Sequence, residues 1–247
     1  MYHGGSQEPM QSYPSDSHRR RQNGLHQVDE RRERILETAQ SLFLSDGLEQ
    51  TSMRQIADAS GIAAVTLYRY FPDRHPIAIE IAARMIKQIF DVCSEAARPE
   101  ADAALAELND ERYRRETFCR YCLAMVDNYR RLRDAYRYIG TFDNLYRESY
   151  TSRELAVLYR RRLREAVSGM PALDLHEGPP EAEYDRGRMV TLSNVIMSYM
   201  QKMATRGEMM GREQRVRFRV QMRHFRTYLE SILVSEFGWE PETRSCP

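Results

Sequence analysis

The side chains best suited to chemistry in this sequence lie in one run, TSMRQIADASGIAAVTLYRYFPDRH, which spans residues 51–75. The guanidinium group of Arg54 can form two hydrogen bonds with guanine, and short apolar side chains later in the run can contact the methyl group of thymine. The residues expected to face the major groove of DNA are Arg54, Ala63, Ala64, Val65 and Thr66. These residue types predict recognition of base edges rather than catalysis.

The spacing within this run predicts two short helices joined by a tight turn. Ser52 and Gln55 have the spacing of a capping box, so one helix is expected to begin there. Gly61 can adopt the left-handed backbone of a tight turn, and a second helix is expected over about residues 63–70. Two helices joined in this way can place the second in the major groove while the first crosses the phosphates.

A third helix is expected before this run. Asp29 can cap a helix through RRERILETAQSLFLSDG, in which apolar residues recur every three or four positions, and Gly47 is its expected C-terminal stop. Phe71 ends the second helix, because a residue that precedes a proline resists helical angles. Asp73 can then cap the next helix.

Residues 31–81 resemble the DNA-binding domain of the tetracycline-repressor (TetR) family. The matching features are the ILETAQSLF helix, Gly47, Thr51-Ser52, Ile56-Ala57, Gly61-Ile62 and Thr66-Leu67-Tyr68-Arg69-Tyr70-Phe71. The resemblance implies an all-helical homodimer whose second domain binds a small effector and controls the affinity for double-stranded operator DNA. It also implies contacts to phosphate oxygens, which hydroxyl and guanidinium groups can bond. Carried onto this sequence, those contacts fall on Thr51 or Ser52, Tyr68, Tyr70 and Arg74.

The front of the expected recognition helix departs from the family. There the family commonly shows Ser or Thr, then a polar or basic residue, then glycine, whereas this chain has Ala63, Ala64 and Val65. Two polar groups that could read bases are therefore missing. Three hypotheses remain open: a ligand-responsive repressor on a palindromic operator, a regulator that activates or acts without a small effector, and a helical small-molecule or protein binding module whose headpiece no longer reads DNA specifically.

Charge and hydropathy limit the classes of protein. Lysine and arginine number 37 and aspartate and glutamate 36, a net charge of +1, so DNA affinity has to come from local placement of charge. No apolar run approaches the roughly 18 residues of a membrane span, and no signal-peptide pattern opens the chain. We expect a cytoplasmic protein with no membrane contact.

Beyond residue 76 the sequence shows only helical patterns. Helices are expected over about residues 73–97, 111–133, 135–146, 152–167, 183–205 and 212–237. We therefore predict an all-α fold with four parts: a disordered basic tail (1–28), a helix-turn-helix domain (29–75), an effector-binding and dimerisation domain (76–240) and a short tail (241–247). The basic run at residues 18–21 is either a solvated tail or an arm that follows the DNA backbone or minor groove.

Two sets of side chains in the second domain are candidates for binding, although each also fits ordinary core. Methionine and aromatic side chains make adaptable walls for apolar ligands, and the candidates for an effector pocket are Phe90, Met125, Tyr129, Tyr159 and Met197. Apolar residues of the last helix recur at steps of four and three, the spacing of packed helices, and the TetR resemblance places the dimer contact in the last two helices. The candidates for that interface are Leu192, Tyr199, Phe225, Leu229, Ile232 and Leu233.

Cysteine and histidine chemistry is weakly indicated. Cys119 and Cys122 have a spacing that zinc sites use, but they fall inside an expected helix and lack a second pair. The six histidines are scattered, and the sequence has neither a glycine-rich phosphate loop nor a G-x-S-x-G turn. We expect reduced core cysteines, no metal, no cofactor, no catalytic residue and hence no enzyme.

Overall fold

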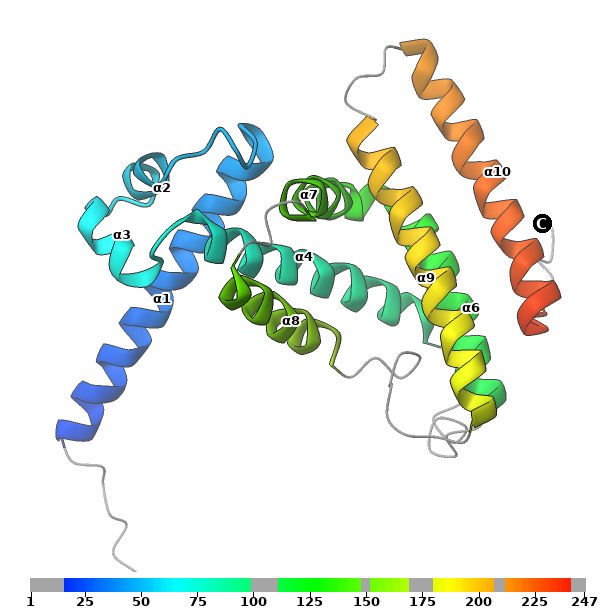
Figure 1. Cartoon of the computed structure of the whole chain (residues 1–247), viewed down its shortest axis with the longest axis horizontal. Coiled ribbons are helices and arrows are strands. Elements are labelled where there is room, and N and C mark those ends of the chain that lie inside the picture. The colour runs from blue at the N-terminus through cyan, green and yellow to red at the C-terminus, as the bar shows by residue number, and fades with distance from the viewer. Residues whose placement is uncertain (1–15, 99–110, 148–151, 169–179, 207–211, 241–247) are drawn as a thin grey trace, which may run out of the picture.

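The structure is a computed structural model that describes residues 16–98, 111–147, 152–168, 180–206 and 212–240. These residues form helices and contain no strand, so the prediction of an all-α fold is confirmed (Figure 1). No helix among them is long and apolar enough to cross a membrane. The helices are α1 (Asp16–Ser45), α2 (Met53–Ala59), α3 (Ala64–Tyr70), α4 (Arg74–Ala97), α6 (Glu111–Asp127), α7 (Tyr129–Arg147), α8 (Arg153–Val167), α9 (Pro180–Arg206) and α10 (Arg212–Phe237).

The first three helices form the helix-turn-helix unit that the sequence predicts. The Ser52 side chain accepts a hydrogen bond from the Gln55 backbone and the Gln55 side chain accepts one from the Ser52 backbone, so the capping box is present. Gly61 turns the chain between α2 and α3 with φ 67°, and Gly47 follows α1 with φ 97°. Side chains from all three helices share one buried core, which includes Leu36, Ile56 and Leu67.

Helix α1 begins earlier than the sequence predicts. It starts at Asp16 rather than at Asp29, so the expectation of disorder through residue 28 is wrong for residues 16–28. This stretch has no proline, and its single glycine costs a helix only about 1 kcal/mol. The imidazole of His26 lies 3.3 Å from the Glu30 carboxylate one turn later, and side-chain pairs at this spacing add a little to helix stability. Residues 1–15 and 241–247 lie outside the described residues.

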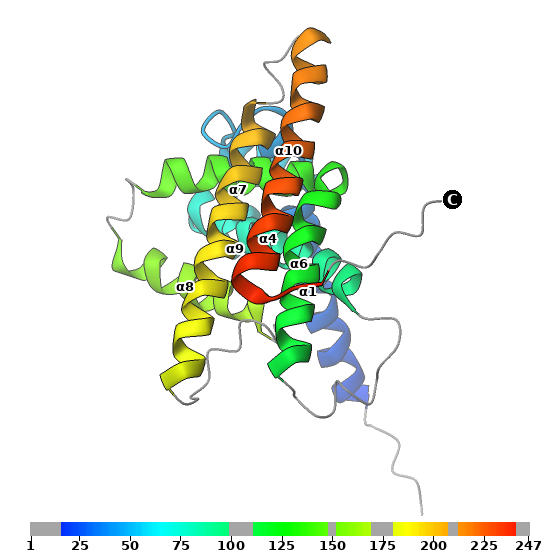
Figure 2. The same cartoon turned by 90° about the vertical axis from the view of Figure 1, so that its right-hand side faces the viewer.

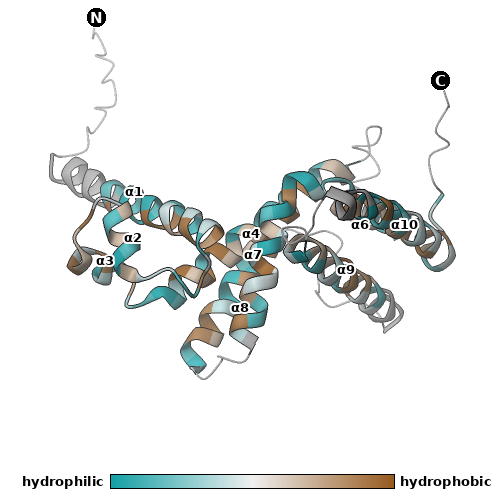
Figure 3. Ribbon diagram, turned by 90° about the horizontal axis from the view of Figure 1, so that it is seen from above, coloured by the Kyte–Doolittle hydropathy of each residue, from teal (hydrophilic) through white to brown (hydrophobic). Residues whose placement is uncertain are grey.

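Helix α4 connects the helix-turn-helix unit to the second domain. The Asp73 carboxylate accepts a 2.7 Å hydrogen bond from the His75 backbone and caps the helix, as predicted. Along its length α4 packs against α1 and then against α6, α7 and α8. Figure 3 shows the two parts on either side of this shared helix, with α1, α2 and α3 at one end and α6, α9 and α10 at the other.

The sequence predicts one helix over residues 111–133, but the structure breaks it at Asn128. The Asn128 backbone and side-chain amides both donate to the Ala124 carbonyl at 3.0 Å, and its own carbonyl accepts from Arg131 and Leu132. Asn128 therefore ends α6 and begins α7. The piece expected over residues 135–146 is the continuation of α7.

Helices α9 and α10 lie on the side of the molecule away from α1 (Figure 1). Helix α10 packs against α6, with the Phe237 ring 5.3 Å from the Phe118 ring, and it reaches the start of α7, with the Phe218 ring 5.2 Å from the Tyr129 ring. Figure 2 shows α10 as the outermost of these helices, lying over α9 and α6. One long side of α10 therefore has no neighbour among the described residues of the chain.

Candidate nucleic-acid interface

Helix α3 is anchored on one side and exposed on the other. Leu67 is fully buried, whereas Val65 and Tyr68 keep 76% and 54% of their surface exposed. Ala63 stands at the N-cap and makes no side-chain hydrogen bond, and its carbonyl accepts from the Thr66 and Leu67 backbones. The helix thus forms without the polar cap that the family commonly has, and it presents an exposed apolar side chain where that family has glycine.

Arg69 is a residue of this face that the sequence interpretation missed. It follows Val65 by four positions, is exposed, and therefore lies on the same side of α3. The helical spacing of four was the signal that could have found it. Its guanidinium group adds five hydrogen-bond donors to a surface otherwise made of methyl groups and hydroxyls.

Arg54 stands beside this face on α2. Its side chain is 87% exposed, and its Nε lies 3.9 Å from the Asp58 carboxylate. An ion pair as exposed as this one contributes little, so it does not hold Arg54 away from a ligand. That Arg54 faces DNA stays a prediction.

Thr51 does not fit the role implied by the resemblance. Its side chain is fully buried, and its hydroxyl donates a 2.8 Å hydrogen bond to the Gly47 carbonyl. The hydroxyl closes the loop between α1 and α2 and is not available to a phosphate. Ser52 is exposed, although its hydroxyl is shared with Gln55 in the capping box.

Tyr70 and Arg74 lie where the recognition helix meets α4, and both are partly exposed. The Arg74 guanidinium donates a 2.8 Å hydrogen bond to the Glu49 carbonyl in the loop before α2. This bond occupies one of five donors, so Arg74 can support the loop and still contact a phosphate.

Replacing Arg74 with alanine is expected to weaken binding to specific and random DNA by similar factors, because a phosphate contact carries no base information. The slope of log affinity against log salt concentration should fall by about one unit. Fluorescence anisotropy across a salt series measures both, with Arg160→Ala, an exposed arginine of α8, as the control. An unchanged salt slope would show that Arg74 only supports the loop.

A set of ion pairs joins the recognition helix to α8 through α4. The Glu80 carboxylate of α4 accepts hydrogen bonds from Arg32 of α1 at 2.9 Å and from the Arg162 Nε of α8 at 2.8 Å. The Arg32 guanidinium also lies 5.2 Å from the centre of the Phe71 ring, directly after α3. A shift of α8 therefore has a path of contacts to the end of the recognition helix.

A second set of contacts joins the helix-turn-helix unit to α7. The Arg137 guanidinium donates to the Leu44 carbonyl of α1 at 3.0 Å. Near the end of α7, the Tyr146 hydroxyl lies 2.8 Å from Nδ1 of His75 on α4. Helix α7 thus contacts α1 and the start of α4 directly, whereas α8 reaches α1 through Glu80 of α4.

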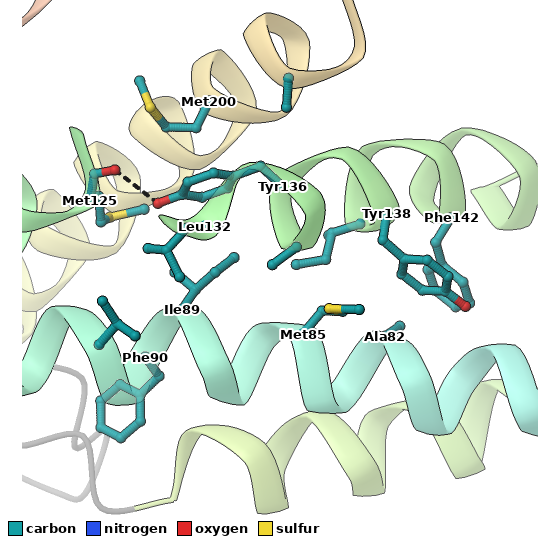
Figure 4. Close-up of a cluster of buried hydrophobic side chains, with 14 of the residues drawn as sticks. Ala82, Met85, Ile89, Phe90, Met125, Leu132, Tyr136, Tyr138, Phe142 and Met200 are labelled. Carbon is teal, nitrogen blue, oxygen red and sulfur yellow. Dashed lines mark hydrogen bonds between the residues drawn. The ribbon is translucent and has the colours of Figure 1, made fainter. Parts of the chain in front are cut away.

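The five residues predicted for an effector pocket come from different helices, and their joint pocket stays a prediction. Phe90, Met125 and Tyr129 are buried; in Figure 4 the Phe90 ring points to the opposite side of α4 from Tyr136, whose hydroxyl donates to the Met125 carbonyl. The fifth residue, Tyr159 on α8, packs 5.5 Å from Phe142. Phe142 stands 13 positions after Tyr129 on α7, which is about 20 Å of helix. Tyr159 therefore lies far from Tyr129 along α7, and Met197 on α9 is only partly buried.

The residues predicted for a dimer interface are mostly used within one protomer. Leu229 and Leu233 are fully buried inside the chain, so their assignment to an interface is wrong. Tyr199 stacks on Phe225 with ring centres 3.9 Å apart, which joins α9 to α10. Leu192 and Ile232 are partly buried. The reason is geometric, because steps of four and three mark the face of α10 that packs inward.

The buried cysteines have no reactive character. Burial raises the pKa of the Cys93 and Cys119 thiols to about 12 and the pKa of Cys122 well above its usual value, so all three stay protonated near neutral pH. Over the described residues, no group of three or more potential metal ligands lies together. Cys246 lies outside them.

The chain is similar to known bacterial regulators. A family model described as bacterial regulatory proteins, tetR family, matches residues 35–81. The transcriptional repressor KstR2 of Mycobacterium tuberculosis is 32% identical over 77 residues, which are 30% of this chain and 38% of that protein. The repressor KstR of Rhodococcus jostii is 38% identical over 60 residues, 24% of this chain and 28% of that protein. The alignments thus span less than two fifths of these relatives.

Two solved structures are similar to most of this chain at low identity. One is a putative TetR-family regulator from Shewanella sp. PV-4, with a TM-score of 0.48 and 17% identity over 82% of this chain and 95% of that chain. The other is the fatty acid degradation regulator FadR from Bacillus halodurans, with a TM-score of 0.46 and 16% identity over 85% of this chain and 97% of that chain. The family model and the geometry of α1, α2 and α3 agree on the same residues. Residues 35–81 therefore form a DNA-binding domain of the TetR family of bacterial regulatory proteins.

Proposed function

We propose that this protein is a ligand-responsive transcriptional repressor that binds a palindromic operator as a homodimer. The observation that carries the proposal is the outward side of α3, where Val65, Tyr68 and Arg69 are exposed while Leu67 fixes the helix in the core. A helix held in this way after a tight turn has the geometry of a recognition helix in the major groove. Repression rather than activation is supported by the relatives KstR2 and KstR, both named transcriptional repressors.

We assign the two activities to two parts of the chain. Residues 29–75, with the N-terminal turns of α1 beyond them, bind DNA, and residues 76–240 bind the effector and form the dimer. Several polar contacts cross this boundary, namely Arg32–Glu80, Glu33–Arg84, Leu44–Arg137 and His75–Tyr146. They give the second domain a means of moving the first.

Dimerisation through α9 and α10 is supported by apolar side chains on their outer side. Val195 of α9 and Val220, Tyr228 and Val234 of α10 are all exposed in the single chain. Val220, Thr227 and Val234 recur at intervals of seven residues, which places them on one face of the helix. A symmetric dimer through this face would read an inverted repeat whose halves lie about one helical turn, roughly 34–36 Å, apart or somewhat more.

Effector control has a physical route through α4. Arg74 and Phe90 are 16 positions apart, so α4 spans roughly 24 Å between the DNA end and the core of the second domain. An effector that shifts α7 or α8 acts on α4 through Tyr146 or Glu80 and changes the separation of the two recognition helices. Such coupling is typically about 1–3 kcal/mol and is reciprocal, so operator DNA should weaken effector binding by the same factor.

Selection of genomic fragments by the full chain, followed by footprinting, tests the proposal. The expected result is protection of an inverted repeat at nanomolar to micromolar protein. Binding that does not distinguish the selected fragments from random DNA would instead favour the alternative of a helical binding module without specific readout.

Replacing Arg54 with alanine is expected to relax base preference at one position in each half-site. Losing a good bidentate contact to guanine costs about 1–3 kcal/mol at that position. A binding series against all single-base variants of the operator measures the effect. A variant that binds every sequence uniformly more weakly would place Arg54 on a phosphate instead.

A further inference from the structure

A cavity of about 640 Å³ lies between the beginning of α6 and the end of α10. Small-molecule sites commonly have about 300–1,000 Å³, so its size suits a compact organic ligand. The residues described around it are Arg112, Arg115, Glu116, Cys119, Phe237, Gly238, Trp239 and Glu240. None of them belongs to the pocket or the interface predicted from the sequence. Figure 1 shows α6 and α10, which carry them, on the side of the molecule away from α3.

The aromatic wall of this cavity is held in place. Gly238 has φ 62°, and the Gly238 and Trp239 amides donate to the Val234 and Leu233 carbonyls at 3.1 and 3.2 Å. This is the hydrogen-bond pattern that closes a helix with a left-handed residue, and it fixes the backbone that carries Trp239. The Phe237 ring also contacts the Phe118 ring and the guanidinium group of Arg188 on α9. A flat aromatic ligand meets a wall that is already ordered.

The opposite wall is rich in hydrogen-bond donors. Arg112 and Arg115 are three positions apart on α6, so both guanidinium groups lie on the same side of the helix. Both interact within the protein, but each guanidinium group has five donors and can donate to a carboxylate in addition.

The acidic groups around the cavity are Glu116, Cys119 and Glu240, and two of them repel a bound anion little. The Glu116 carboxylate accepts two hydrogen bonds from Arg120, at 3.0 and 3.2 Å, which compensate its charge. Burial raises the pKa of the Cys119 thiol to about 12, so the sulfur is neutral and does not repel an anion. Glu240 is exposed. The cavity thus places two guanidinium groups opposite the aromatic wall, and Arg120 compensates the charge of Glu116.

We propose that this cavity binds a small aromatic carboxylate, with its ring against Trp239 and its carboxylate on Arg112 and Arg115. The site is separate from the DNA-binding surface and from any pocket among the middle helices. It gives the second domain an anion-binding position next to the end of α10.

The test uses the full chain with 4-nitrobenzoate and its neutral counterpart 4-nitrobenzyl alcohol, followed by calorimetry and by fluorescence. Trp239 is the only tryptophan of the sequence, so quenching of its emission reports on this cavity. Because a hydrogen bond to a charged group is worth about 1.5–3 kcal/mol, the acid should bind at least tenfold more tightly than the alcohol. The double variant Arg112→Gln with Arg115→Gln should lose about that factor for the acid and little for the alcohol.

The matched control is Arg160→Gln with Arg164→Gln, two exposed arginines on α8, which should bind the acid like the wild-type protein. Circular dichroism checks that each variant is folded. Equal affinity for acid and alcohol in the wild-type chain, which needs no variant, would overturn the proposal. So would undiminished binding of the acid by the folded double variant. No DNA enters the assay, so its outcome is independent of the proposed repressor function.

Discussion

Replacing Val65 with glutamate is expected to reduce operator affinity by roughly 100-fold or more while the protein stays folded. Val65 is 76% exposed and stands at the outward side of α3, so its side chain contributes little to the core. A carboxylate at this position enters the strongly negative field of the phosphates. It also cannot replace the apolar contact that valine can make with the methyl group of thymine. Anisotropy with the footprinted operator measures the loss, and thermal unfolding measures the stability.

Val157→Glu is the matched control for that experiment. Val157 is 57% exposed on α8, so the same change is made on a helix that is not expected to touch DNA. It should leave both operator affinity and stability near the wild-type values. Wild-type affinity in Val65→Glu would show that α3 does not enter the groove, and it would leave the helix-turn-helix as a structural unit only.

The local signals of the DNA-binding domain could be predicted because each acts within a few residues. The Ser52 and Gln55 capping box needs only its own three-residue spacing, and Gly61 needs only a backbone that other residues avoid. Thr51 could not be assigned from the same run. Its hydroxyl donates to the Gly47 carbonyl only because the loop between α1 and α2 folds back on itself, and a linear pattern does not show this.

The sequence also could not show which helix covers each apolar face, because that depends on contacts between segments far apart in the chain. A step of four and three shows that Leu229 and Leu233 are covered, but it does not show whether α6 of the same chain or a second chain covers them. The break at Asn128 was hidden similarly, because the apolar period continues from α6 into α7. The side chains left for a partner are the isolated valines and the tyrosine outside that period.

Replacing Val220 and Val234 with arginine is expected to convert the proposed dimer into a folded monomer. Both valines are 46% exposed in the single chain, so arginine can be accommodated there by one protomer. In a symmetric dimer the new charges of the two copies would face one another, and like charges placed together at an interface cost several kcal/mol. Sedimentation velocity should show the mass of one chain.

Operator binding should fall with the dimer, by roughly 100-fold or more, because a monomer contacts one half-site where a dimer contacts two. Val157→Arg provides the same chemical change on an exposed valine of α8 and should leave the dimer intact. Leu229→Arg is unsuitable for this purpose, since it buries a charge inside the protomer and would unfold it whether or not a dimer exists. A double variant that remains dimeric and keeps its operator affinity would require the two recognition helices to be brought together by a surface other than the outer side of α10.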